Sequence, residues 1–334
     1  MTPHHPRPVR RSVRIFRSAT RPRSAGRSAA PSRLTYRLLR ALHPADTATL
    51  LILTVVTGTL AVAAAFGAPV GGALATHAVL LGVFAGVAWW LGPRQGAIVR
   101  GIAVIATMFT LYTTLGHVAF AAIPWLADPW LERADRALLL GRSPSLAVEP
   151  LAASAWTRLL SFGYAMFIPY LYLSILLSLL GRPPAERDEF VTGFATLYAL
   201  SFLGYLFLPA RGPVVQMAGD FTVPIDGGAF YPLILRSVEQ VGGPHGAFPS
   251  LHLGASLFAT LFDLRHRNPL RALIYLPLVG TIALATLVLR YHYAVDLVAA
   301  VLLAWTAGVI ARRAMARRGE TAAIRAETAA EAAR

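Results

Sequence analysis

Long apolar runs, separated by short polar or arginine-containing segments, fill the chain between residues 47 and 312. A transmembrane helix needs about 20 apolar residues to cross roughly 30 Å of hydrocarbon. Lipid offers no hydrogen-bond partner to the backbone, so a span must be helical or part of a closed barrel. The runs lack two-residue alternation, which favours helices. They predict eight spans, at about 47–67, 72–91, 99–122, 155–180, 189–209, 249–264, 271–290 and 293–312.

Composition supports an all-α, polytopic membrane protein. Hydrophobic residues make up 56% of the 334 residues and charged residues only 14%, whereas soluble domains carry about 25% charged residues. This excludes a soluble globular protein. The chain has no cysteine, which excludes disulfides, thiolate metal sites and cysteine nucleophiles.

The basic residues indicate how the chain is oriented. They number 31, all arginine, against 16 acids, and 24 of them fall on one side of the eight predicted spans together with both termini. Because cytoplasmic loops carry the excess of arginine, we expect both termini in the cytoplasm. Arginine used without lysine is typical of a GC-rich bacterial genome, so we expect a bacterial cell membrane.

The same pattern divides the chain into five parts. Residues 1–40 contain 11 arginines and no acid, which predicts a disordered cytoplasmic tail that binds anionic lipid; no aromatic residues alternate with the arginines, so we do not expect nucleic acid binding. The apolar run that follows is too long for a cleaved signal. We expect transmembrane helices in 41–122, an amphipathic outer interfacial segment in 123–154, a catalytic transmembrane core in 155–312 and a cytoplasmic tail in 313–334.

Six polar residues lie at the outer ends of the predicted spans, although the topology was derived from charge bias alone. They are Arg211, Ser250, His252, Arg290, His292 and Asp296. We therefore expect three helix ends and a loop to converge at the outer face. His245, seven residues before His252, is a further candidate for contact with a substrate.

Two of these segments combine residues suited to phosphate chemistry. Pro249-Ser250-Leu251-His252 opens a predicted helix, whose free amides and dipole favour an anion. His292 and Asp296 are four residues apart and share a helix face, so the carboxylate can orient the imidazole. An ordinary proline-initiated helix and a structural ion pair are the alternative interpretations.

Two imidazoles, two guanidiniums and a helix N-terminus form an acid–base pair within an anion site. One histidine can attack phosphorus while the other protonates the leaving oxygen, and Arg211, Arg290 and Ser250 can bind the phosphate. No HExxH, GxSxG or Walker motif is present. We expect neither a metal nor a cofactor.

These residues resemble the type 2 phosphatidic acid phosphatase superfamily. Its Pro-Ser-x-His motif is similar to Pro249–His252, and its histidine followed four residues later by aspartate is similar to His292 and Asp296. The resemblance implies a six-helix-type core, His292 as the nucleophile that becomes phosphohistidine, Asp296 as its orienting group and His252 as the general acid. It also implies that Ser250 is a phosphate ligand.

The sequence departs from the superfamily pattern at two basic positions. Gly204 stands where the first motif has lysine, and Thr286 stands where the third motif has arginine. Arg290, one helical turn after Thr286, could deliver its guanidinium to the same place.

These departures, with the strings FPSLH and RYHY-x-x-D, resemble the membrane inositolphosphotransferases that make inositol phosphorylceramide. In that branch the phosphate travels with its inositol and the lipid leaves. The resemblance implies a lipid phosphate substrate and a polyol acceptor. A water acceptor would make the protein a lipid phosphate phosphatase acting on polyprenyl or phosphatidyl phosphates.

Two other classes of function remain open. A proton-coupled transporter or lipid flippase could use the same histidines and aspartate, although it should carry polar residues at mid-membrane depth in several spans. A lipid-phosphate-binding scaffold without activity is the third interpretation. The sequence specifies neither a partner protein nor an oligomeric state.

Overall fold

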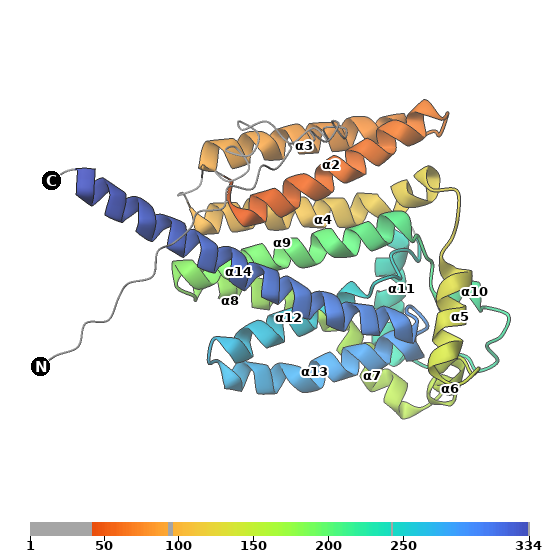
Figure 1. The fold of residues 1–334 in the computed structure, drawn as a ribbon. Helices are drawn as coiled ribbons and strands as arrows, with labels where there is room; N and C mark the ends of the chain where they lie inside the picture. Colours follow the sequence, from red (N-terminus) through yellow and green to blue (C-terminus); the bar gives the residue numbers. More distant parts are fainter. Residues whose placement is uncertain (1–41, 93–95, 242, 333–334) are drawn as a thin grey trace, which may run out of the picture. The chain divides into compact units, whose positions relative to one another are not determined.

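The computed structural model describes residues 42–92, 96–241 and 243–332, and these contain helices and loops but no strand. The predicted basic tail at 1–40 lies outside the described residues. In chain order the helices are α2 (Pro44–Ala65), α3 (Gly71–Leu91), α4 (Ala97–Ala122), α5 (Asp128–Leu138), α6 (Pro144–Ala147), η1 (Glu149–Leu151), α7 (Ala155–Ala165), α8 (Phe167–Leu180), α9 (Pro184–Phe207), α10 (Pro213–Gln216), η2 (Gly228–Phe230), α11 (Tyr231–Gln240), α12 (Leu251–Arg265), α13 (Pro269–Val288) and α14 (Ala294–Ala332) (Figure 1).

Seven stretches among the described residues are long and apolar enough to cross a membrane. They are α2, α3, α4, the α7–α8 pair, α9, α13 and most of α14. The predicted sixth span, 249–264, is the 15-residue helix α12, which at 1.5 Å per residue reaches only about 22 Å. Ten of its residues are buried, so α12 is mainly an inner helix. Length and composition thus support seven spans, and both the eighth span and the six-helix core stay predictions.

The fourth predicted span consists of two helices. α7 ends at Ala165 and α8 begins at Phe167, with Met166 between them. Pro169 lies in the first turn of α8 and has no N–H to donate to the carbonyl of Ala165, so the helical hydrogen-bond ladder is interrupted there. The break places Tyr164 and Phe167 next to the site described below.

Helix α9 forms the centre of the bundle. In its most apolar 18-residue window 78% of the residues are buried, the largest share among the candidate spans of the described chain. It packs against α4, α2 and α14, and Figure 1 shows it between α4 and α14. A central rigid helix holds the loop that follows it, which carries Arg211.

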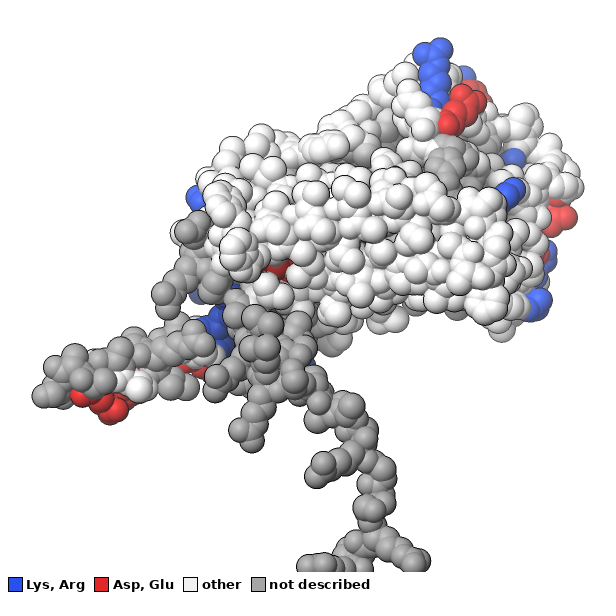
Figure 2. Space-filling model, turned by 90° about the horizontal axis from the view of Figure 1, so that it is seen from above, with Lys and Arg blue, Asp and Glu red and all other residues white. Residues whose placement is uncertain are grey.

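The outer surface of the bundle is apolar along its sides and charged at its ends. Trp89 is 83% exposed and Trp305 62% exposed, and Figure 2 shows a broad uncharged flank with charged residues gathered at its two ends. An apolar surface of this size needs lipid to cover it. The described chain is therefore that of a multi-pass membrane protein.

Candidate active site

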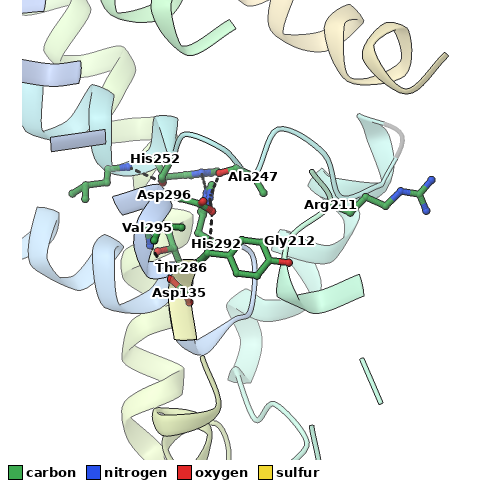
Figure 3. Close-up of polar contacts among 12 residues, drawn as sticks. Asp135, Arg211, Gly212, Ala247, His252, Thr286, His292, Val295 and Asp296 are labelled. Carbon is green, nitrogen blue, oxygen red and sulfur yellow. Dashed lines mark hydrogen bonds and ion pairs between the residues drawn. The ribbon is translucent and has the colours of Figure 1, made fainter. Parts of the chain in front are cut away.

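Three loops meet at the end of the bundle where α12 and α14 begin (Figures 1 and 3). The amide of Ala247 donates to the carbonyl of Ala210 at 3.2 Å, and the amide of Val214 donates to the carbonyl of Arg290 at 2.7 Å. The Ser250 amide donates to the Asp296 carbonyl at 3.3 Å. These bonds join the loop after α9, the start of α12 and the segment between α13 and α14.

The two candidate histidines are in direct contact. The Nδ1 of His252 lies 3.3 Å from the Nε2 of His292, with the ring planes inclined by 66°. Each imidazole nitrogen needs about 3 Å to reach a reacting atom, so a phosphoryl group between them requires the two nitrogens to separate to roughly 5–6 Å. The arrangement places a candidate nucleophile next to a candidate proton donor. The two rings are in contact, and they must move apart before a phosphoryl group can enter between them.

The partners of His292 determine which of its nitrogens carries the proton. Its Nδ1 lies 2.7 Å from the Ala247 carbonyl oxygen and 3.4 Å from the Oδ2 of Asp296. Both oxygens accept hydrogen bonds, so Nδ1 must be the donor. The Nε2 then holds a lone pair directed at His252, as a nucleophile requires.

Asp296 is held at the N-terminus of α14. Its side chain is fully buried, and its Oδ2 accepts the amide of Tyr293 at 2.8 Å. The helix dipole favours negative charge at this position. The carboxylate is therefore anchored by its own helix while it contacts His292.

Aromatic rings enclose His252. Tyr164 stacks on its imidazole with centroids 4.7 Å apart, and Phe167 lies at 4.6 Å. Both come from the α7–α8 break. The pattern of apolar residues does not predict these two rings; Pro169, which indicates a break in the helix, is the one signal in the sequence for their position.

Ser250 begins α12 as its N-cap. Its Oγ accepts the amide of Leu253 at 3.4 Å, and the side chain is 1% exposed. The side chain therefore caps the helix in the usual way. The predicted role as a phosphate ligand needs this hydroxyl to turn toward the histidines.

The two arginines do not reach the histidine pair. The guanidinium of Arg211 lies over Phe120 at 5.2 Å, and Figure 3 shows it directed away from the histidines. Arg290 lies 3.6 Å from Glu149, donates to the Val223 carbonyl and stacks on Phe221. Arg290 thus holds the outer loop, whereas Arg211 is an exposed residue whose guanidinium lies against Phe120.

A small cavity of ≈ 40 Å³ adjoins the histidines and is also lined by Arg211 and His245. The Nδ1 of His245 lies 2.9 Å from the Gly243 carbonyl, and its ring packs against Gly116 of α4. A side chain at Gly116 would collide with this ring, since a Cβ atom there would lie 2.1 Å from it. His245 therefore borders the space next to the catalytic candidates, as a substrate contact would.

Comparison with known proteins identifies one family. The model of the PAP2 superfamily matches residues 129–310, more than half of the chain. All seven candidate site residues fall within this range. No curated protein and no solved structure matches significantly.

We predict that Glu149 makes stability depend on pH in the acid range. The amides of Val223 and Thr222, together with Arg290, hold the pKa of Glu149 below its usual 4.5. A carboxylate whose pKa is lower in the folded than in the unfolded state stabilises the folded state. This stabilisation is complete at a pH above the unfolded-state pKa and is lost as the pH falls through the folded-state pKa. Glu149→Gln should therefore lower the Tm of the detergent-solubilised protein at pH 7 and flatten its decline toward pH 3.

The exposed Glu239 of α11 serves as the control, because its carboxylate makes no hydrogen bond or ion pair among the described residues. Equal pH profiles for Glu149→Gln and the unaltered protein would show that the loop is held by other contacts.

Proposed function

The chain belongs to the PAP2 superfamily, and from this premise we propose that it transfers a phosphoryl group from a lipid-linked phosphate through a phosphohistidine at His292. The superfamily suggests phosphatase- or phosphotransferase-type activity on phosphate esters. The observation that carries the proposal is the 3.3 Å contact between His292 Nε2 and His252 Nδ1. The Nδ1 of His292 is already anchored on the opposite side of the ring.

In the first step the Nε2 lone pair of His292 attacks phosphorus, and the bond from phosphorus to the leaving oxygen breaks. His252, which starts as an imidazolium, gives its Nδ1 proton to that oxygen, so that an alcohol leaves and His252 becomes neutral. The imidazole of His292 becomes positively charged as the N–P bond forms. The nearby Asp296 carboxylate and the Ala247 carbonyl stabilise this charge through Nδ1.

In the second step water or an alcohol attacks the phosphohistidine. His252, now neutral, takes the proton of the attacking hydroxyl as the N–P bond breaks. The product leaves, and both histidines regain their starting states. The two-step route needs one residue to act first as acid and then as base.

The phosphate carries negative charge that the site must balance. The N-terminus of α12 faces the loops and favours an anion, and Arg211 needs only to rotate away from Phe120. Arg290 would have to break its pairing with Glu149. We therefore propose Arg211 as the main guanidinium for the phosphate, with Ser250 and His245 as further contacts and Arg290 as the weakest candidate.

The identity of the acceptor decides the type of reaction. The FPSLH and RYHY-x-x-D strings favour an inositolphosphotransferase-like reaction, in which the phosphate travels with a polyol. Water as acceptor would give a lipid phosphate phosphatase. The contact between the two histidines, on which the proposal rests, is compatible with both reactions.

We also propose that the site faces the outside of a bacterial cell membrane. The loops of the site lie at the opposite end of the bundle from the start of α2 and the C-terminal part of α14 (Figure 1). The arginine bias places those two segments in the cytoplasm.

Replacing the nucleophile tests the proposal directly. His292→Ala should lower the turnover of a ³²P-labelled lipid phosphate by at least about 10³-fold, and the label found on the unaltered protein should disappear. His266→Ala removes a histidine that pairs with Glu186 and Glu189 in another part of the bundle and serves as the control. Undiminished turnover by His292→Ala would refute the phosphohistidine route.

The two arginines should differ in what their removal affects. A hydrogen bond to a charged group contributes about 1.5–3 kcal/mol, so Arg211→Gln should lower kcat/KM roughly 10- to 100-fold without lowering the Tm. Arg290→Gln should chiefly lower the Tm, because it frees Glu149 and the Val223 carbonyl. If Arg290→Gln instead lowers kcat/KM and Arg211→Gln lowers only the Tm, then Arg290 is the residue that binds the phosphate.

The acceptor can be found with purified protein and ³²P-labelled phospholipid. Release of inorganic phosphate without any added alcohol would identify a phosphatase. A labelled product that forms only when inositol or another polyol is supplied, or in which label and polyol move together to a second lipid, is expected for the transferase.

A further inference from the structure

Helix α5 carries two buried acids, although it lies at the end of the bundle. Asp128 and Asp135 are each 1% exposed. They are seven residues apart, which places them on the same helix face. Glu132 and Arg136 pair with each other and are more exposed, at 20% and 37%. The buried face of α5 is thus directed at the loops that carry the site.

Asp128 joins two of those loops. Its Oδ2 accepts the amide of Arg211 at 2.9 Å, and its Oδ1 accepts the amide of Gly212 at 2.8 Å. The same Oδ1 accepts the hydroxyl of Tyr293 at 3.0 Å. Arg211 is the proposed phosphate ligand, and Tyr293 follows the proposed nucleophile His292 directly. All three partners are donors, as an ionised carboxylate requires.

The turn bound by Asp128 is pressed against the backbone that leads to His292. Gly212 has φ +87°, and a Cβ atom there would lie 2.5 Å from the Tyr291 carbonyl oxygen. Only glycine allows this conformation and this approach. The amide of Gly212 is buried between the two loops and that of Arg211 is partly buried, and an unpaired amide is costly there.

Asp135 binds the third element of the site. Its Oδ1 accepts the amide of Val295 at 2.9 Å (Figure 3), one residue before Asp296 and in the first turn of α14. First-turn amides have no partner within their own helix. Burial raises the pKa of Asp135 to about 6. Helix α5 is therefore bonded both to the Arg211 turn and to the helix that carries Asp296.

We propose that Asp128 is a positioning residue, which fixes the backbone of Arg211 relative to His292 and so directs the Arg211 guanidinium to the phosphate. This inference rests on the proposed function. Asp128 does not touch the substrate in this scheme and acts through Arg211, while its bond to Tyr293 joins the Arg211 turn to the segment of His292. Asp135 holds α14 in the matching position.

The activity test is a double-mutant cycle. In Asp128→Asn an amide NH₂ replaces one acceptor oxygen and faces an N–H donor, so kcat/KM should fall roughly 10- to 100-fold, as small misplacements of catalytic groups do. In an Arg211→Gln background the same change should lower kcat/KM little further, because the guanidinium that Asp128 positions is already absent. Arg133→Gln, on the exposed face of α5, is the matched control. Equal losses in both backgrounds would overturn the proposal.

A second measurement does not depend on activity. The chain contains no cysteine, so Arg211→Cys provides a single thiol for a nitroxide spin label. Adding Asp128→Asn should increase the mobility of the label in the electron paramagnetic resonance spectrum, whereas adding Arg133→Gln should not. Tyr293→Phe, which removes one of the three bonds, should have an intermediate effect and replaces Asp128→Asn if that variant does not fold.

The two measurements separate the inference from the proposed function. If the unaltered protein turns over no lipid phosphate but the label becomes mobile in Asp128→Asn, the proposed function fails and the positioning contact stands. If turnover is normal and the label stays unchanged, the positioning role is refuted.

Discussion

The short contact between the Nδ1 of His292 and the carbonyl of Ala247 organises this end of the molecule. It joins the segment before α12 to the segment before α14, and it forces the proton of the imidazole onto Nδ1. The Nε2 is left with a lone pair that faces His252. This hydrogen bond therefore contributes to the packing of two loops and sets the tautomer of the proposed nucleophile.

The loops can be positioned well because they are attached to rigid helices. The Arg211 loop follows the central helix α9, and the α7–α8 break supplies the rings that enclose His252. A site of this kind needs supporting contacts as much as reacting groups. Here α5, which lies across the loops, supplies two buried carboxylates for that purpose.

The site departs from the superfamily pattern in its basic residues. Gly204 stands where a lysine is expected, and the proline and carbonyl of the Phe248–Pro249 segment pack directly against it. Arg290 is paired with Glu149 and stacked on Phe221. The proposed anion site therefore depends on Arg211, the amides of α12 and the histidines, so the proposed function requires Arg211 to be positioned accurately.

The sequence alone determined the helical membrane class, because span length and charge bias are local properties that lipid imposes directly. The same two properties predict that His252, His292 and Asp296 lie at one end of the bundle. It also placed His292 and Asp296 on one helix face through their spacing. Only the tertiary structure decided that Arg290 pairs with Glu149, that α12 is a short inner helix and that Asp128 bonds to a loop 83 residues away. Those outcomes depend on which buried donors and acceptors meet, and a linear pattern does not contain the partners.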